Sequence, residues 1–188
     1  MFWQHRTRSL DPSLKRRWAS DTEKSFGPWG RLLVEDGRFR GLVQYGPASR
    51  FPRARSLPAG PPSRDAAVIT CAYLEGDDLA GTSERLLLEA LADLKSRGVA
   101  AVEAFALTFS DDVAQSDRFT AHHTLFDRDM LDRFGFRPLR SAGQVTLMRL
   151  ALGGLQPAET SSLVARLTQP LRAWPVSLPS PVALRSGT

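Results

Sequence analysis

The stretch from Val68 to Gly98 constrains the fold most, because its apolar pattern changes from strand-like to helix-like across a short turn. Residues 68–74, VITCAYL, form a nearly continuous apolar run that is typical of a buried strand. After the glycine-containing turn 75–81, leucines recur at helical spacing until Gly98: Leu86, Leu87, Leu88, Leu91 and Leu94. This unit predicts an α/β domain, and its helix N-terminus could hold a phosphate or be an ordinary sheet-and-helix connection.

A second apolar run follows the helix at Ala101–Ala106 and predicts another buried strand. Two strands of one sheet that are joined by a helix run parallel, with a right-handed crossover. We therefore expect a parallel strand pair at the centre of the domain.

The flanking segments predict two helices and two hairpins. Asp11 and Pro12 predict a helix start, with the helix running to about Phe26. Asp36-Gly37 predicts a tight turn between strands 31–35 and 39–45. Towards the end of the domain we expect a helix over 126–134 and a closing hairpin over 136–139 and 144–150.

The remaining segments set the domain boundaries. Segment 46–65 holds five prolines, and we expect a long loop there, functional or mobile. Residues 1–11 form a basic N-terminal arm, and residues 12–154 form one domain. Residues 155–188 form an extension with a short helix over 158–167 and then a proline-rich, poorly ordered tail.

The net charge of +5 is concentrated in clusters before the core and in one loop: Arg6, Arg8, Lys15, Arg16, Arg17, Arg50, Arg53 and Arg55. Such clusters could meet nucleic acid, acidic lipid or an anionic cofactor. No aromatic platform accompanies them, which favours a solvated basic surface. The single cysteine, Cys71, and the lack of a signal or membrane-spanning stretch predict a cytoplasmic protein.

In their order, these predicted elements resemble the GNAT (GCN5-related N-acetyltransferase) superfamily. The resemblance is carried by Val68–Gly98, by residues 130–136 (MLDRFGF), which resemble a helix ending in Gly-Phe, and by the strands of Trp29–Tyr45. Residues 29–31, 44–47, 51–54 and 102–105 further resemble an actinobacterial GNAT-like group of mostly uncharacterised proteins.

The resemblance implies a mixed, mostly antiparallel twisted α/β sheet with helices on both faces and a central parallel pair splayed at a cofactor cleft. It also implies acetyl-CoA as the cofactor and homodimers as a common state. The implied cofactor-binding residues are Cys71, Ala72, Tyr73 and Leu74 on the strand, and Gly81, Thr82 and Ser83 at the helix start. Asp78 stands where the family's pyrophosphate loop begins with a basic residue, so this loop is degenerate.

Acetyl transfer needs a base for the amine and an acid for the thiolate. Leu131 stands where many family members have a tyrosine acid. The candidates are Glu103 as the base, His123 or its neighbour His122 as an alternative base, and Tyr45 or Tyr73 as the acid. Packing explains the tyrosines and an outward strand position explains Glu103 equally well, and the histidine pair predicts a loop rather than a metal site.

Two functions follow from these observations. The first is an acyl-CoA-dependent N-acetyltransferase in which an unknown amine attacks the thioester directly. The second is a catalytically weak or inactive GNAT-like module that binds a protein or nucleic acid through its basic segments and tail. The matching order of the helices and strands favours the first function, and the acidic turn before the helix favours the second.

Overall fold

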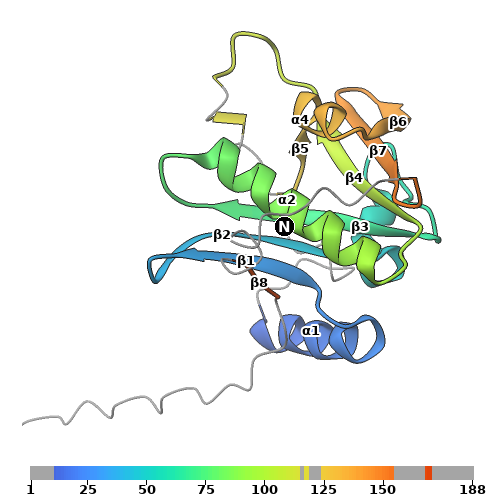
Figure 1. The fold of residues 1–188 in the computed structure, drawn as a ribbon. Helices are drawn as coiled ribbons and strands as arrows, with labels where there is room; N and C mark the ends of the chain where they lie inside the picture. Colours follow the sequence, from blue (N-terminus) through green and yellow to red (C-terminus); the bar gives the residue numbers. More distant parts are fainter. Residues whose placement is uncertain (1–10, 115–116, 119–123, 155–167, 171–188) are drawn as a thin grey trace, which may run out of the picture.

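The computed structural model describes residues 11–114, 117–118, 124–154 and 168–170 (Figure 1). The helices are α1 (Pro12–Phe26), α2 (Leu79–Ser96) and α4 (Arg128–Arg133), with the 3₁₀ segments η1 (Ala48–Arg50) and η2 (Pro52–Ser56). The strands are β1 (Gly30–Glu35), β2 (Arg38–Pro47), β3 (Ala66–Leu74), β4 (Ala101–Leu107), β5 (Phe126–Asp127), β6 (Arg137–Ala142), β7 (Val145–Ala151) and β8 (Thr168–Pro170).

Within the described residues, these strands form one eight-stranded mixed sheet in the order β6-β7-β4-β3-β2-β1-β8, with β5 beside β4. Neighbours along this order are antiparallel except for β3 and β4. Helix α2 lies along one face of the sheet, and α1 packs from the other side (Figure 1). The predicted fold class, including its central parallel pair, is confirmed.

The parallel pairing of β3 with β4 is short. It begins at Ala66↔Ala101 and ends at Ile69↔Ala104. Beyond it, β3 stays paired with β2 as far as Leu74, while β4 takes β5 as its new neighbour at Ala106↔Phe126. The two central strands therefore separate halfway along, as the predicted splay requires.

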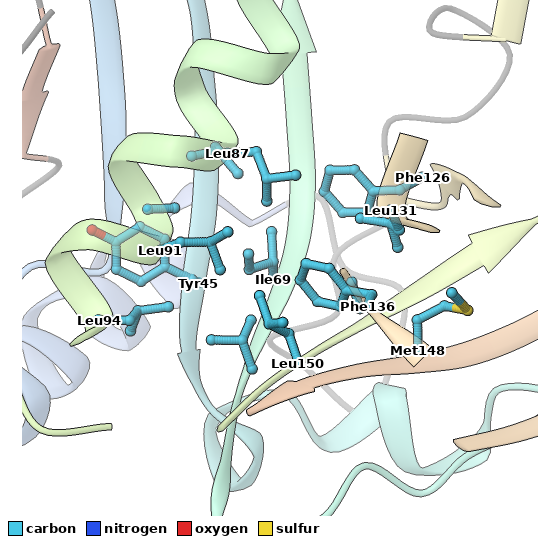
Figure 2. Close-up of a cluster of buried hydrophobic side chains, with 14 of the residues drawn as sticks. Tyr45, Ile69, Leu87, Leu91, Leu94, Phe126, Leu131, Phe136, Met148 and Leu150 are labelled. Atoms are coloured by element: carbon cyan, nitrogen blue, oxygen red, sulfur yellow. The ribbon is translucent and has the colours of Figure 1, made fainter. Parts of the chain in front are cut away.

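The larger core lies between the sheet and helices α2 and α4. Leu86, Leu87 and Leu94 of α2 are almost completely buried on it, and Leu88 points to solvent. Figure 2 shows Tyr45 on one side of Ile69, under α2, and Phe126 and Leu131 on the other side. The amphipathic pattern of 79–96 thus places the helix across the strands that it connects.

A second core on the opposite face explains the proline-rich segment 46–65. Phe51 and Ala54, from η1–η2 and their junction, have no exposed surface. Phe51 packs against Trp18 of α1 with ring centroids 5.4 Å apart, and the Trp18 indole donates to the Arg50 carbonyl at 2.7 Å. The expected loop instead forms 3₁₀ turns that cover the sheet, because its apolar side chains are buried against the sheet and α1.

Local signals set most element boundaries. The Asp11 carboxylate accepts from the Ser13 N–H at 2.8 Å and caps α1, as predicted. Asp36 and Gly37 both have positive φ, as the tight hairpin turn requires. The predicted helix 126–134 is shorter: its first two residues are β5, and Asp127 caps α4.

The C-terminal extension contributes to the sheet. Residues 168–170 pair with Arg31–Leu33 at the outer edge of β1. Sequence patterns predict only a poorly ordered tail there, because three residues carry no strand signal without the edge that they join. Residues 1–10 of the basic arm, the predicted helix over 158–167 and the last 18 residues lie outside the described residues. No helix in the described ranges has the length and apolar character needed to span a membrane.

One carboxylate joins the helices to the sheet. Asp93 of α2 accepts from Arg31 of β1 at 2.6 Å and from the Tyr45 hydroxyl of β2 at 2.8 Å, and it forms an ion pair with Arg97 at 2.8 Å. Arg97 also donates to the Phe26 carbonyl at the end of α1 and lies over the Phe26 ring at 4.2 Å. Asp93 therefore links α2 to β1 and β2 and, through Arg97, to the end of α1.

We expect Asp93→Ala to lower the free energy of unfolding by about 3 kcal/mol, because it leaves two guanidinium groups and a buried hydroxyl without their shared acceptor. Urea denaturation measures the effect. Glu84→Ala is the matched control, since its pair with Arg133 is about half exposed, and it should cost less than about 0.5 kcal/mol. An equal loss in both variants would contradict the role of Asp93.

Candidate functional site

The site to which the sequence points lies at the start of α2, where the chain turns out of β3. A pocket of about 250 Å³ opens there. It is lined by the β1–β2 hairpin, the turn and the first helical turns: Glu35, Arg40, Glu75, Gly76, Asp77, Asp78, Thr82 and Arg85. Four carboxylates therefore face two guanidinium groups.

The two arginines of the pocket are held by one acid. Glu35 accepts from Arg85, and it lies 3.5 Å from the Nε atom of Arg40. The three remaining carboxylates, of Glu75, Asp77 and Asp78, give the pocket a net negative charge. Sequence reasoning missed Glu35, Arg40 and Arg85, because only the tertiary structure brings the hairpin beside the turn.

Asp78 is the N-cap of α2. Its Oδ1 atom accepts from the Gly81 N–H at 2.9 Å, and its carbonyl accepts from the Thr82 N–H at 3.1 Å. A Cβ atom at Gly81 would lie 2.3 Å from Asp78 Oδ2. Gly81 thus makes room for the carboxylate of Asp78.

The other predicted cofactor residues of α2, Thr82 and Ser83, are almost completely buried, although Thr82 also contributes to the lining of the pocket. Thr82 is 3% exposed, and its methyl group lies 3.1 Å from the position that a Cβ at Gly41 would take. Ser83 is 4% exposed and donates to the Met130 sulfur at 3.5 Å. Both hydroxyl residues therefore serve helix packing, and Gly41 permits that close approach.

The predicted strand residues Cys71–Leu74 occupy the separated half of β3, where their partners on β2 run from Gln44 to Gly41. Ala72 and Leu74 pack against the larger core, and Tyr73 is 39% exposed. On the other side of the separation, β5 takes the edge of β4, and Phe126 and Leu131 are buried there in the same core as Ile69 (Figure 2).

The structure does not bring the predicted catalytic residues together. The Tyr45 hydroxyl is buried beneath α2 against Asp93, and burial raises the pKa of Tyr45 above its ordinary value, with the Asp93 charge adding to the effect. Glu103 has no exposed surface, and it lies on the opposite face of the sheet, in the half where β3 and β4 are still paired. His123 lies outside the described residues.

Glu103 connects the segment before β3 to the sheet. It accepts from the Ser63 N–H at 2.8 Å and from Arg149 of β7 at 2.8 Å. Arg149 also binds Asp65 at 2.6 Å, and this hydrogen bond holds the pKa of the Asp65 carboxyl below its usual range. These contacts make Glu103 part of a buried ion pair between two strands and a loop.

The acidic start of α2 opposes the diphosphate of acetyl-CoA, the cofactor that the predicted family would use. This diphosphate would meet the Asp78 carboxylate on the Gly81 N–H, with Glu75 and Asp77 beside it. In the described ranges, no group of three or more His, Cys, Asp or Glu residues is placed to hold a metal ion.

Several solved structures that resemble this chain are acetyltransferases. A proposed acetyltransferase of Salmonella typhimurium, solved with acetyl-CoA, is 15% identical with a TM-score of 0.47, and the match covers 81% of this chain and 80% of that one. A proposed acetyltransferase of the GNAT family from Desulfovibrio desulfuricans is 15% identical with a TM-score of 0.45, over 80% and 87% of the two chains. An N-acetyltransferase from Staphylococcus aureus is 12% identical with a TM-score of 0.45, over 77% and 79%.

No family model and no curated protein matches the sequence. Structural likeness at such identities and TM-scores says nothing about the substrate or the catalytic residues of this chain. The chemistry of the site therefore rests on its own residues.

We expect the stability of the protein to fall as the pH rises above about 10, the ordinary pKa of an unfolded tyrosine, because the folded state binds the Tyr45 proton more tightly. Below that pH both states keep the proton and the contribution is complete. Urea midpoints measured across the alkaline range test this. Tyr45→Phe should flatten the dependence, whereas the exposed Tyr73→Phe should keep it, and an unchanged profile in Tyr45→Phe would refute the assignment.

Glu103→Gln should lower the free energy of unfolding by about 2 kcal/mol, since the neutral amide weakens both buried hydrogen bonds to charged or backbone donors. Asp65→Asn, on the exposed side of Arg149, provides the control and should cost less. Chemical denaturation compares the two. If Glu103→Gln is fully stable, then the ion pair does not support the fold.

Proposed function

We propose that the protein is a binding module built on an acetyltransferase-type fold, and that it binds the phosphate backbone of nucleic acid. The observation that carries the proposal is where the net charge lies. Helix α1 and segments η1–η2 together hold seven basic residues, which we call the basic region: Lys15, Arg16, Arg17, Lys24, Arg50, Arg53 and Arg55. The same segments hold only two acids, Asp21 and Glu23, so their net charge equals the +5 of the whole chain.

The two segments of the basic region form one unit in space. Trp18 and Phe51 join them through the second core, and Arg50 donates to the Asp21 carbonyl at 3.2 Å and to the Ser25 hydroxyl at 2.7 Å. Arg16, Arg17, Lys24 and Arg55 are exposed. Guanidinium and ammonium groups held on a rigid surface bind phosphates without reading sequence, and the affinity depends on counterion release.

The closed state of the α2 site supports a binding role. Asp78 occupies the helix N-terminus, Leu131 is buried in the core, and Tyr45 and Glu103 are engaged in structural contacts. These residues supply no free acid or base next to the pocket. A module that binds phosphates through the basic region needs neither an acid nor a base at this pocket.

An acyl-CoA-dependent N-acetyltransferase is the second candidate. The specific observation in its favour is the separation of β3 from β4 after Ile69, beside the start of α2. Its donor would be acetyl-CoA and its acceptor an unknown amine. A thermal-shift titration with acetyl-CoA separates the candidates, because a ligand that binds only the native state raises the melting temperature.

We expect the full chain to bind a fluorescent DNA duplex of about 20 base pairs with a dissociation constant of roughly 1 to 100 μM near physiological salt. Replacing Arg16, Arg17 and Arg55 together with glutamine should weaken binding about tenfold or more. It should also reduce the slope of log affinity against log salt by roughly 2 to 3. Fluorescence anisotropy across a salt series measures both quantities.

The matched control replaces three exposed arginines elsewhere with glutamine: Arg38, Arg133 and Arg137. It removes the same charge and should change the salt slope little. Equal losses in the two triple variants would contradict the assignment of the site. Binding of a polyglutamate peptide as tight as that of the duplex would overturn nucleic acid in favour of an acidic protein partner.

A further inference from the structure

We infer that Asp78 is an intramolecular substitute for a bound anion at the start of α2, and that this one carboxylate closes the site to diphosphates. The first four N–H groups of a helix have no partners within it, and an anion placed against them is stabilised by those donors and by the helix dipole. In this chain the Asp78 carboxylate accepts from the Gly81 N–H at 2.9 Å, so a negative group already lies there.

The carboxylate of Asp78 lies in the space beside Gly81. Asp78 Oδ2 would lie 2.3 Å, and Asp78 Cγ 2.9 Å, from a Cβ atom at residue 81. In this conformation the carboxylate of the chain itself therefore takes the volume that a side chain at residue 81 would need. A ligand phosphate would need the same volume and the same N–H donor, and the two are mutually exclusive.

The Asp78 side chain could exclude a phosphate by occupying the Gly81 N–H or by its negative charge. Two substitutions distinguish these causes. Asp78→Asn keeps an oxygen acceptor of the same size on the Gly81 N–H and removes the charge, so the site should stay closed. Asp78→Gly removes the side chain, vacates the N–H and costs the helix little, because glycine is tolerated at the N-cap. Asp77→Asn removes one carboxylate from the same pocket without touching the cap, and it is the matched control.

The experiment titrates the wild-type chain and the three variants with inorganic pyrophosphate and with coenzyme A, using calorimetry and amide chemical shifts. We expect Asp78→Gly to bind pyrophosphate at least about tenfold more tightly than the wild type, the gain expected from a hydrogen bond to a charged acceptor. The shift changes should centre on Gly81 and Thr82. Wild type, Asp78→Asn and Asp77→Asn should show neither effect.

Three results would overturn the inference. Pyrophosphate binding by the wild type with shifts at Gly81 would mean that the carboxylate closes nothing. Equal gains in Asp78→Asn and Asp78→Gly would assign the closure to charge. A folded Asp78→Gly variant that binds no pyrophosphate, with folding verified by circular dichroism, would mean that the closure does not depend on Asp78. None of these results bears on DNA binding by the basic region, so the two proposals fail separately.

Discussion

The structure depends on one short parallel pairing, in which β3 and β4 lie side by side only from Ala66↔Ala101 to Ile69↔Ala104. Because parallel neighbours cannot be joined by a tight turn, the chain needs a crossover connection over one face of the sheet. Helix α2 is this connection between β3 and β4. The central strands are then covered on both faces, by α2 and α4 on one side and by α1 with η1–η2 on the other. Asp93 holds the crossing helix to β1 and β2 through Arg31 and Tyr45.

The same pairing decides what the centre of the sheet can hold. Where β3 and β4 separate, an extended ligand could lie against free strand edges. In this chain β5 pairs with the free part of β4, and Phe126 is buried in the same core as Ile69. At the mouth of the separation, Asp78 accepts the Gly81 N–H. Two groups of the chain itself, β5 and the Asp78 carboxylate, therefore occupy the edge of β4 and one N–H at the start of α2.

Prediction from sequence succeeded where the signal was local. Asp11 before Pro12, Asp36-Gly37 and the leucines of 86–94 each depend on a few neighbours, and the structure has the predicted helix, turn and buried face. It was wrong for 46–65, because Phe51 and Ala54 become buried only against α1, a distant segment. β8 could not be predicted for the same reason, since its three residues become a strand through the edge of β1.

Neighbouring residues alone predict the order of the main helices and strands, the parallel crossover and the acidic character of the turn before α2, because periodicity, turn residues and charge are local properties. Only the tertiary structure decided what the candidate residues contact. It buries Tyr45 against Asp93 and pairs Glu103 with Arg149 on the face opposite α2. It also seats the carboxylate of Asp78 on Gly81. The physical reason is that a side chain's function depends on the partners that reach it through space, and in this fold those partners come from distant strands and helices.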